Sequence, residues 1–138
     1  MPGLVLDASV ALAWALPAEA RADAARNVLL RIAEEAAVVP AHWRLEVGNG
    51  LLMGERRGRL LPGQADAVWR HMVAMPIETD QETNARAWSS AAGLARKHGL
   101  TLYDAAYLEL AARRGLPLAT FDAALARAAG AETVTLAA

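Results

Sequence analysis

Short runs of apolar residues alternate along this chain with longer segments in which apolar positions recur every three or four residues. Short runs rich in Val and Leu favour buried strands, and the longer period favours amphipathic helices. The pattern predicts strands at 4–6, 37–39, 76–78, 116–120 and 133–136, and helices at 9–17, 19–35, 41–57, 62–74, 79–98, 101–115 and 122–129.

Capping residues support several of these helix ends. Ser9 is predicted to cap the first helix, and Thr79 with Glu82 has the spacing of a capping box. Thr101 is predicted to begin a helix that Gly115 closes. Strands separated by helices imply a parallel sheet covered on both faces. Residues 1–138 are therefore expected to form a single three-layer α/β/α domain, a size that suits one domain.

Four acids stand at positions that this fold would bring to one cleft. Asp7 and Asp122 directly follow predicted strands, and binding crevices of parallel sheets lie beyond the carboxyl ends of the strands. Asp104 lies in the first turn of its helix, and Glu46 lies within an apolar helix with Asn49 on the same face. Whether the two helices converge on that cleft is not fixed by the spacing.

If they converge, the carboxylates would repel one another unless a cation neutralised them. Oxygen ligands select hard ions such as Mg²⁺ or Mn²⁺, which can activate a water molecule for attack on a phosphate. Each acid also has a structural interpretation: Asp7 and Asp122 suit helix caps, and Asp104 completes a capping pattern with Thr101. An unpaired Glu46 would be costly to bury, although a place on the solvent side would avoid that cost.

Composition narrows the choice of partners. The formal net charge is −1, so contact with nucleic acid must come from local patches, such as the arginines at 56, 57 and 59 or at 113 and 114. Helix ends favour arginine anyway, and both clusters lie there. The chain has no cysteine, no basic leader and no apolar stretch long enough to cross a bilayer. We expect a soluble, intracellular protein without a membrane partner.

Four ordered blocks contain the four acids: Leu-Val-Leu-Asp7-Ala-Ser9, Glu46-Val-Gly-Asn49, Leu102-Tyr103-Asp104-Ala-Ala-Tyr107-Leu-Glu-Leu-Ala and Leu118-Ala-Thr120-Phe-Asp122. The blocks resemble the motifs of PIN-domain ribonucleases, and among them those of the VapC toxins of toxin–antitoxin pairs. The likeness covers nearly the whole chain, and it implies a PIN-like α/β/α fold.

The resemblance implies a cytoplasmic, Mg²⁺- or Mn²⁺-dependent endoribonuclease that forms a homodimer and is inhibited by a VapB-like antitoxin. The residues that match the family's metal-binding acids are Asp7, Glu46, Asp104 and Asp122. Ser9, Asn49 and Thr120 match its polar supporting positions. Trp14 is our candidate for contact with the antitoxin or a second copy.

Two other classes of protein compete with this interpretation. The first is a non-catalytic interaction module on the same fold, in which the acids only cap helices. The second is a phosphoacceptor receiver domain, which needs paired acids after its first strand and a lysine near its last. Here Asp7 stands alone and Lys97 is the only lysine, which argues against the receiver domain.

Overall fold

The computed structural model describes residues 1–16 and 21–138. The helices are α1 (Ala8–Ala15), α2 (Ala22–Glu35), α3 (Trp43–Arg56), α4 (Gln64–Val73), α5 (Thr83–Arg86), α6 (Ala92–His98), α7 (Leu102–Arg114) and α8 (Ala123–Ala131), with a π-helical turn, η1 (Ala87–Ala91), between α5 and α6. The strands are β1 (Leu4–Leu6), β2 (Ala37–Val39), β3 (Ile77–Thr79) and β4 (Leu118–Ala119).

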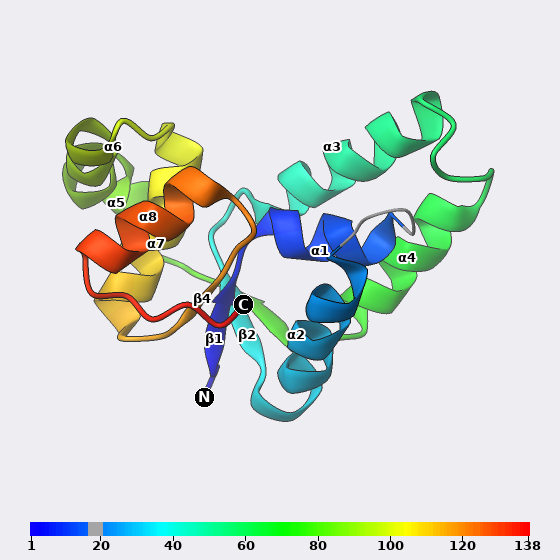
Figure 1. Cartoon of the computed structure of the whole chain (residues 1–138), viewed down its shortest axis with the longest axis horizontal. Coiled ribbons are helices and arrows are strands. Elements are labelled where there is room, and N and C mark those ends of the chain that lie inside the picture. The colour runs from blue at the N-terminus through cyan, green and yellow to red at the C-terminus, as the bar shows by residue number, and fades with distance from the viewer. Residues whose placement is uncertain (17–20) are drawn as a thin grey trace.

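The four strands form one parallel sheet in the order β3-β2-β1-β4. Helices α1 to α4 lie on one side of the strands and α5 to α8 on the other (Figure 1), which confirms the predicted three-layer α/β/α architecture. The three residues of β1 are fully buried at the centre of the sheet. Each such side chain contributes about 2 kcal/mol by its burial.

Three local features position α7 and α3, the helices that carry Asp104 and Glu46. Helix α7 begins as predicted, because the Thr101 side chain accepts a hydrogen bond from the Asp104 N–H at 3.1 Å. It ends at Gly115, whose φ of 65° is in the left-handed region that favours glycine. Helix α3 packs closely on α1, where a Cβ at Gly50 would stand 2.5 Å from the Leu12 side chain. A side chain at position 50 would therefore require the Leu12 side chain to shift.

Two predicted caps are wrong. Helix α1 begins at Ala8, directly after the strand, so Asp7 and not Ser9 occupies its N-cap position. Thr79 pairs with Val39 inside β3, so its backbone belongs to the sheet and cannot cap a helix. The helix predicted for 79–98 instead begins at Thr83 and is interrupted by η1.

The last predicted strand is also wrong. Thr133 has a positive φ of 58°, which turns the chain out of an extended conformation. The segment 133–136 is reduced to one bridge between Leu136 and Leu118. Strands β1 and β2 have the predicted bounds, and the other predicted strands and helices are present with shifted ends. The expected end of the first helix at Pro17 and the expected start of the second at Glu19 lie outside the described residues.

Candidate active site

Asp7 stands where β1 passes into α1, and its side chain is 5% exposed. Its Oδ2 atom accepts hydrogen bonds from the Ser9 hydroxyl at 2.6 Å and from the Thr120 hydroxyl at 2.7 Å. Its side chain makes no capping bond to α1, which disfavours the purely structural interpretation of Asp7. The two hydroxyls instead hold the carboxylate at the carboxyl end of the sheet.

The same two hydroxyls connect Asp7 to the segment that carries Asp122. The Phe121 N–H donates to the Ser9 hydroxyl at 3.0 Å, and the Asp122 N–H donates to the Thr120 hydroxyl at 3.0 Å. The Oδ1 atom of Asp122 accepts from the Leu125 N–H at 2.8 Å, so Asp122 also caps α8. The structural role predicted for Asp122 is therefore present, alongside its place next to Asp7.

Glu46 reaches this region from α3, and its side chain is 34% exposed. Its Oε1 atom accepts a hydrogen bond from the Tyr107 hydroxyl at 2.7 Å and lies 3.2 Å from His42 Nε2. Burial raises the pKa of Glu46, but the hydrogen bonds from His42 and Tyr107 outweigh it and leave the pKa below its usual value. Glu46 is therefore held as an anion.

Asp104 completes the group from the first turn of α7. Burial and the negative charges of Asp7, Asp122 and Glu46 raise the pKa of Asp104. Burial likewise raises the pKa of Asp7, with further contributions from Glu46 and Asp122, while the Ser9 and Thr120 hydroxyls partly offset the rise. The fold thus brings the four acids close enough for their charges to interact. We call Asp7, Glu46, Asp104 and Asp122 the acidic cluster.

The acidic cluster fits a hard divalent cation in its chemistry, because its donors are all carboxylate oxygens that repel one another. Among the ion pairs of the described residues, none joins these acids to an arginine or lysine. Within residues 1–16 and 21–138, however, no three acid or histidine side chains form a ready ligand set. Because Tyr107 and His42 hold Glu46, binding a cation would require other carboxylates of the cluster to turn toward it.

Asn49 differs from the other predicted supporting residues. It is exposed on α3. In the described part of the chain, Ser9 and Thr120 contact Asp7, whereas no hydrogen bond involves the Asn49 side chain. Its supporting role stays a prediction.

Sequence reasoning missed two residues that contact Glu46. The available signal for His42 is its spacing of four residues before Glu46, and His42 occupies the N-cap position of α3. Tyr107 lies in the motif that contains Asp104, but the sequence assigns it no function. Its ring is fully buried, and its hydroxyl reaches Glu46 across 61 positions of sequence, which no local pattern predicts.

Arg113 and Arg114 are occupied by ion pairs within the chain. Arg113 bonds Asp80 at 2.8 Å and Glu109 at 2.9 Å, and Arg114 bonds Glu78 at 3.0 Å. This favours the structural interpretation of that cluster over phosphate contact. Trp14 stacks on His71 with ring centroids 5.2 Å apart, so part of its ring is covered within the chain. Its contact with a partner stays a prediction.

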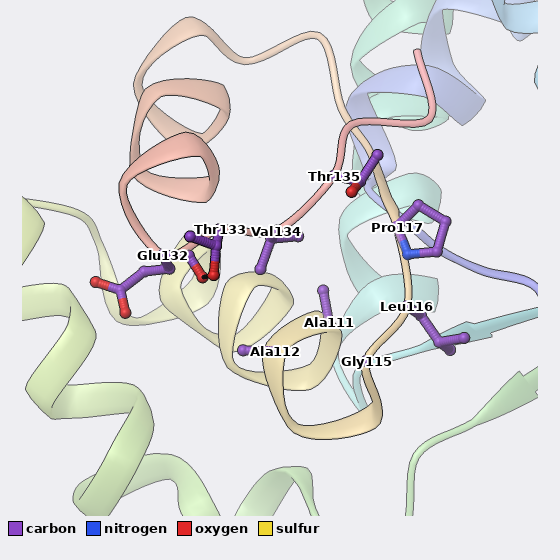
Figure 2. A pocket seen from close by; sticks show the side chains of 9 residues that line it. All are labelled: Ala111, Ala112, Gly115, Leu116, Pro117, Glu132, Thr133, Val134 and Thr135. Atoms are coloured by element: carbon purple, nitrogen blue, oxygen red, sulfur yellow. Dashed lines mark hydrogen bonds between the residues drawn. The ribbon is translucent and has the colours of Figure 1, made fainter.

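A pocket of about 350 Å³ lies between the end of α7 and the C-terminal segment (Figure 2). Its described lining is mostly small and apolar, and the one acid in that lining is Glu132. The Glu132 carboxylate bonds Lys97 and His98, each at 2.7 Å. The pocket includes none of the four acids of the cluster, so it is separate from the candidate active site.

The fold and the site define a class of parallel α/β domains with carboxylates gathered at the carboxyl edge of the sheet, and comparison with known proteins specifies the family. The family model of the PIN domain matches residues 4–131. Ribonuclease VapC3 of Pyrobaculum aerophilum is 35% identical over 127 residues, covering 89% of this chain and 92% of that protein. Ribonuclease VapC3 of Mycobacterium tuberculosis is also 35% identical over 127 residues, covering 91% and 86%. The chain belongs to the PIN-domain family, in its VapC ribonuclease group.

Solved structures agree on the fold. The crystal structure of PAE2754 from Pyrobaculum aerophilum superposes with a TM-score of 0.66 at 23% identity, covering 92% of this chain and 84% of that one. VapC20 of Mycobacterium tuberculosis, a toxin that cleaves the sarcin–ricin loop, gives a TM-score of 0.66 at 18% identity, covering 91% and 95%. PIN-domain nucleases generally depend on a divalent metal. In the described part of this chain, no helix has the length and apolar character needed to cross a membrane.

Proposed function

We propose that this protein is the toxin of a toxin–antitoxin pair and hydrolyses RNA phosphodiester bonds with Mg²⁺ or Mn²⁺ held by the acidic cluster. The observation that carries the proposal is the gathering of four carboxylates at the carboxyl end of the sheet, where burial, together with their mutual repulsion, raises the pKa of Asp7 and Asp104. Such repulsion, with no arginine or lysine of the described residues paired to these acids, lowers the stability of the fold unless a cation offsets it. The identity to VapC ribonucleases supports the same conclusion.

Each residue of the cluster has a proposed role. Asp7 and Asp104 would be the direct ligands, while Glu46 and Asp122 would complete the shell through water or a second ion. When bound, the ion would supply an activated water and neutralise charge on the leaving oxygen. The hydroxyls of Ser9 and Thr120 hold one oxygen of Asp7 and the backbone that precedes Asp122. They would preserve the spacing of these two carboxylates while the RNA is bound.

The reaction we propose is attack of water on the phosphorus, with loss of the 3′ oxygen, so that the products carry a 5′-phosphate and a 3′-hydroxyl. Purified protein should cut RNA with Mg²⁺ or Mn²⁺ and not in EDTA. Asp7→Asn and Asp104→Asn should abolish cutting and keep the circular-dichroism spectrum of the wild type. Glu34→Gln, a change of an exposed acid on α2, is the matched control and should keep full activity.

Melting experiments separate an enzyme from an interaction module. Mn²⁺ should raise the melting temperature of the wild type by mass action and should not raise that of Asp7→Asn. Cleavage that continues in EDTA would refute metal dependence. A protein that neither cuts RNA nor responds to Mn²⁺ would instead be the non-catalytic PIN-like module.

We further propose a homodimer and a VapB-like antitoxin as partners, acting in the cytoplasm where the RNA substrate is. Four large apolar side chains are exposed on α3, α4 and the turn between them: Leu45, Leu52, Leu61 and Val73. Exposed apolar area of this kind is typical of interaction surfaces. Light scattering at increasing protein concentration should give twice the chain mass, and Leu52→Glu should lower it toward one.

A further inference from the structure

Tyr107 lies at the junction of the elements that carry the acidic cluster. It follows Asp104 by three residues on α7, so the two side chains share one face of the helix. Its hydroxyl donates to Glu46 on α3 at 2.7 Å and also interacts with the backbone of Ala8, the residue after Asp7. One buried hydroxyl, on the helix that carries Asp104, therefore lies between Glu46 and the residue after Asp7.

His42 contacts the same carboxylate oxygen from the other side. Its Nε2 atom lies 3.2 Å from Glu46 Oε1 and 3.1 Å from the Tyr103 carbonyl oxygen. Both of these atoms are acceptors, so Nε2 must carry the proton and donate. The His42 ring also packs edge-on against Tyr107, with centroids 5.2 Å apart. The two donors thus support each other around Glu46.

Both hydrogen bonds meet Oε1, and within the described part of the chain Glu46 Oε2 accepts none. A carboxylate with one oxygen fixed by two donors loses most of its rotational freedom, and its second oxygen is presented in one direction. Residues behind a metal ligand commonly act in this way, by orienting the ligand before the ion arrives.

We propose that Tyr107 and His42 are positioning residues, which fix Glu46 so that the acidic cluster binds its divalent cation more tightly than a mobile glutamate would allow. This inference rests on the proposed function, because it assumes that the cluster takes up a cation. Neither residue needs to contact RNA or the ion. Their effect on cleavage passes through Glu46.

The test measures Mn²⁺ binding by electron paramagnetic resonance, without RNA, in Tyr107→Phe and in the matched control Tyr103→Phe. Both changes remove one phenolic oxygen from α7, but the Tyr103 side chain is exposed and its carbonyl remains in place. Tyr107→Phe should weaken Mn²⁺ binding about 10-fold, as losses behind a metal ligand do, and Tyr103→Phe should not change it. In cleavage assays, the Mn²⁺ concentration for half-maximal rate should rise about 10-fold, with the rate at saturating Mn²⁺ kept within about twofold.

A double-mutant cycle asks whether Tyr107 acts through Glu46. In a Glu46→Gln background, Tyr107→Phe should cause no further loss of Mn²⁺ affinity, because the carboxylate that it orients is gone. An equal loss in both backgrounds would overturn the proposal, as would wild-type affinity in Tyr107→Phe.

A second pair of variants guards against a folding defect in Tyr107→Phe. His42→Ala should weaken Mn²⁺ binding, and His42→Gln should restore part of it, because the glutamine amide can still donate to Glu46. Equal affinity of both His42 variants and the wild type would overturn the role of His42.

A wild-type protein that neither binds Mn²⁺ nor cuts RNA would contradict the proposed function itself. If the wild type binds Mn²⁺ and cuts RNA, and the Tyr107 and His42 variants bind Mn²⁺ with the same affinity, only the positioning role is contradicted.

Discussion

Asp80 provides a sharp test of how the sheet edge is held together. It follows β3, its side chain is 1% exposed, and it is bonded to two arginines of α7. Arg113 donates to its two oxygens at 2.8 and 3.2 Å, Arg114 donates at 3.3 Å, and the Thr83 hydroxyl donates at 3.0 Å. Asp80→Asn would retain the shape of the side chain, but its amide nitrogen would face guanidinium donors.

These contacts determine how much Asp80→Asn should lower the free energy of unfolding. The variant loses about two charge-assisted hydrogen bonds, each contributing about 1.5 to 3 kcal/mol. Arg113 keeps Glu109 at 2.9 Å and Arg114 keeps Glu78 at 3.0 Å, so neither arginine is left as an unpaired charge. We therefore expect a loss of about 3 kcal/mol, at the lower end of the cost of breaking a buried pair. For a chain of 138 residues this lowers the melting temperature by about 10 °C.

The pH dependence gives a second signature. Burial raises the pKa of Asp80, but the hydrogen bonds and charge of Arg113, with help from Thr83 and Arg114, outweigh it and leave the pKa below its usual value. The stabilisation by ionised Asp80 is thus fully present above the unfolded pKa of about 4 and is lost as the pH falls through the lower folded pKa. The difference between wild type and variant should be constant from pH 7 to pH 5 and shrink below about pH 4.

Urea unfolding followed by circular dichroism measures this difference, with Asp66→Asn as control because Asp66 is an exposed acid at the start of α4. The midpoint should fall for Asp80→Asn with an unchanged slope, and the control should stay within about 0.5 kcal/mol of the wild type. A loss below about 1 kcal/mol for Asp80→Asn, or a difference that persists unchanged at low pH, would refute the reasoning.

Three further changes test the site and its supports. Asp7→Asn should make the metal-free protein more stable to urea at pH 7, because the raised pKa of Asp7 means that its ionised form opposes folding. This gain in stability should vanish below about pH 4, where Asp7 is protonated in both states. A variant less stable than the wild type at pH 7 would contradict this explanation. Thr101→Ala should lower the free energy of unfolding by about 1 kcal/mol through loss of the α7 cap, visible as a lower melting temperature. Gly115→Ala should cost about 1 kcal/mol, because its φ of 65° strains a side chain, and equal stability would count against that explanation.

The elements whose position depends on local periodicity were predictable from the sequence. Strands β1 and β2 and the Thr101 and Gly115 ends of α7 follow from apolar runs and capping chemistry over a few residues. The errors arose where tertiary contacts override a local signal. Thr79 has the spacing of a capping residue, yet pairing with Val39 places it in the sheet.

The site was predictable only in part, for the same reason. Strand ends and motif order placed Asp7 and Asp122 at one edge, and the structure brings them there. The contact between Tyr107 and Glu46 joins two helices whose crossing depends on side-chain packing, including the close approach at Gly50. No pattern within either helix encodes that crossing.

Asp7, Asp80 and Asp122 each follow a strand at the same edge of the sheet, yet the structure gives them opposite environments. Hydrogen bonds from Arg113 and Arg114 outweigh the effect of burial and lower the pKa of Asp80, whereas burial raises the pKa of Asp7 and the charges of Glu46 and Asp122 add to that rise. A strand-end position therefore gathers carboxylates without deciding what they do. The partners that the fold places around each carboxylate decide that. Neutralised acids hold the fold together, and acids left to repel one another retain affinity for a cation. The arginines that make this distinction are more than thirty positions from Asp80 in sequence, so only the folded chain reveals which acid is structural.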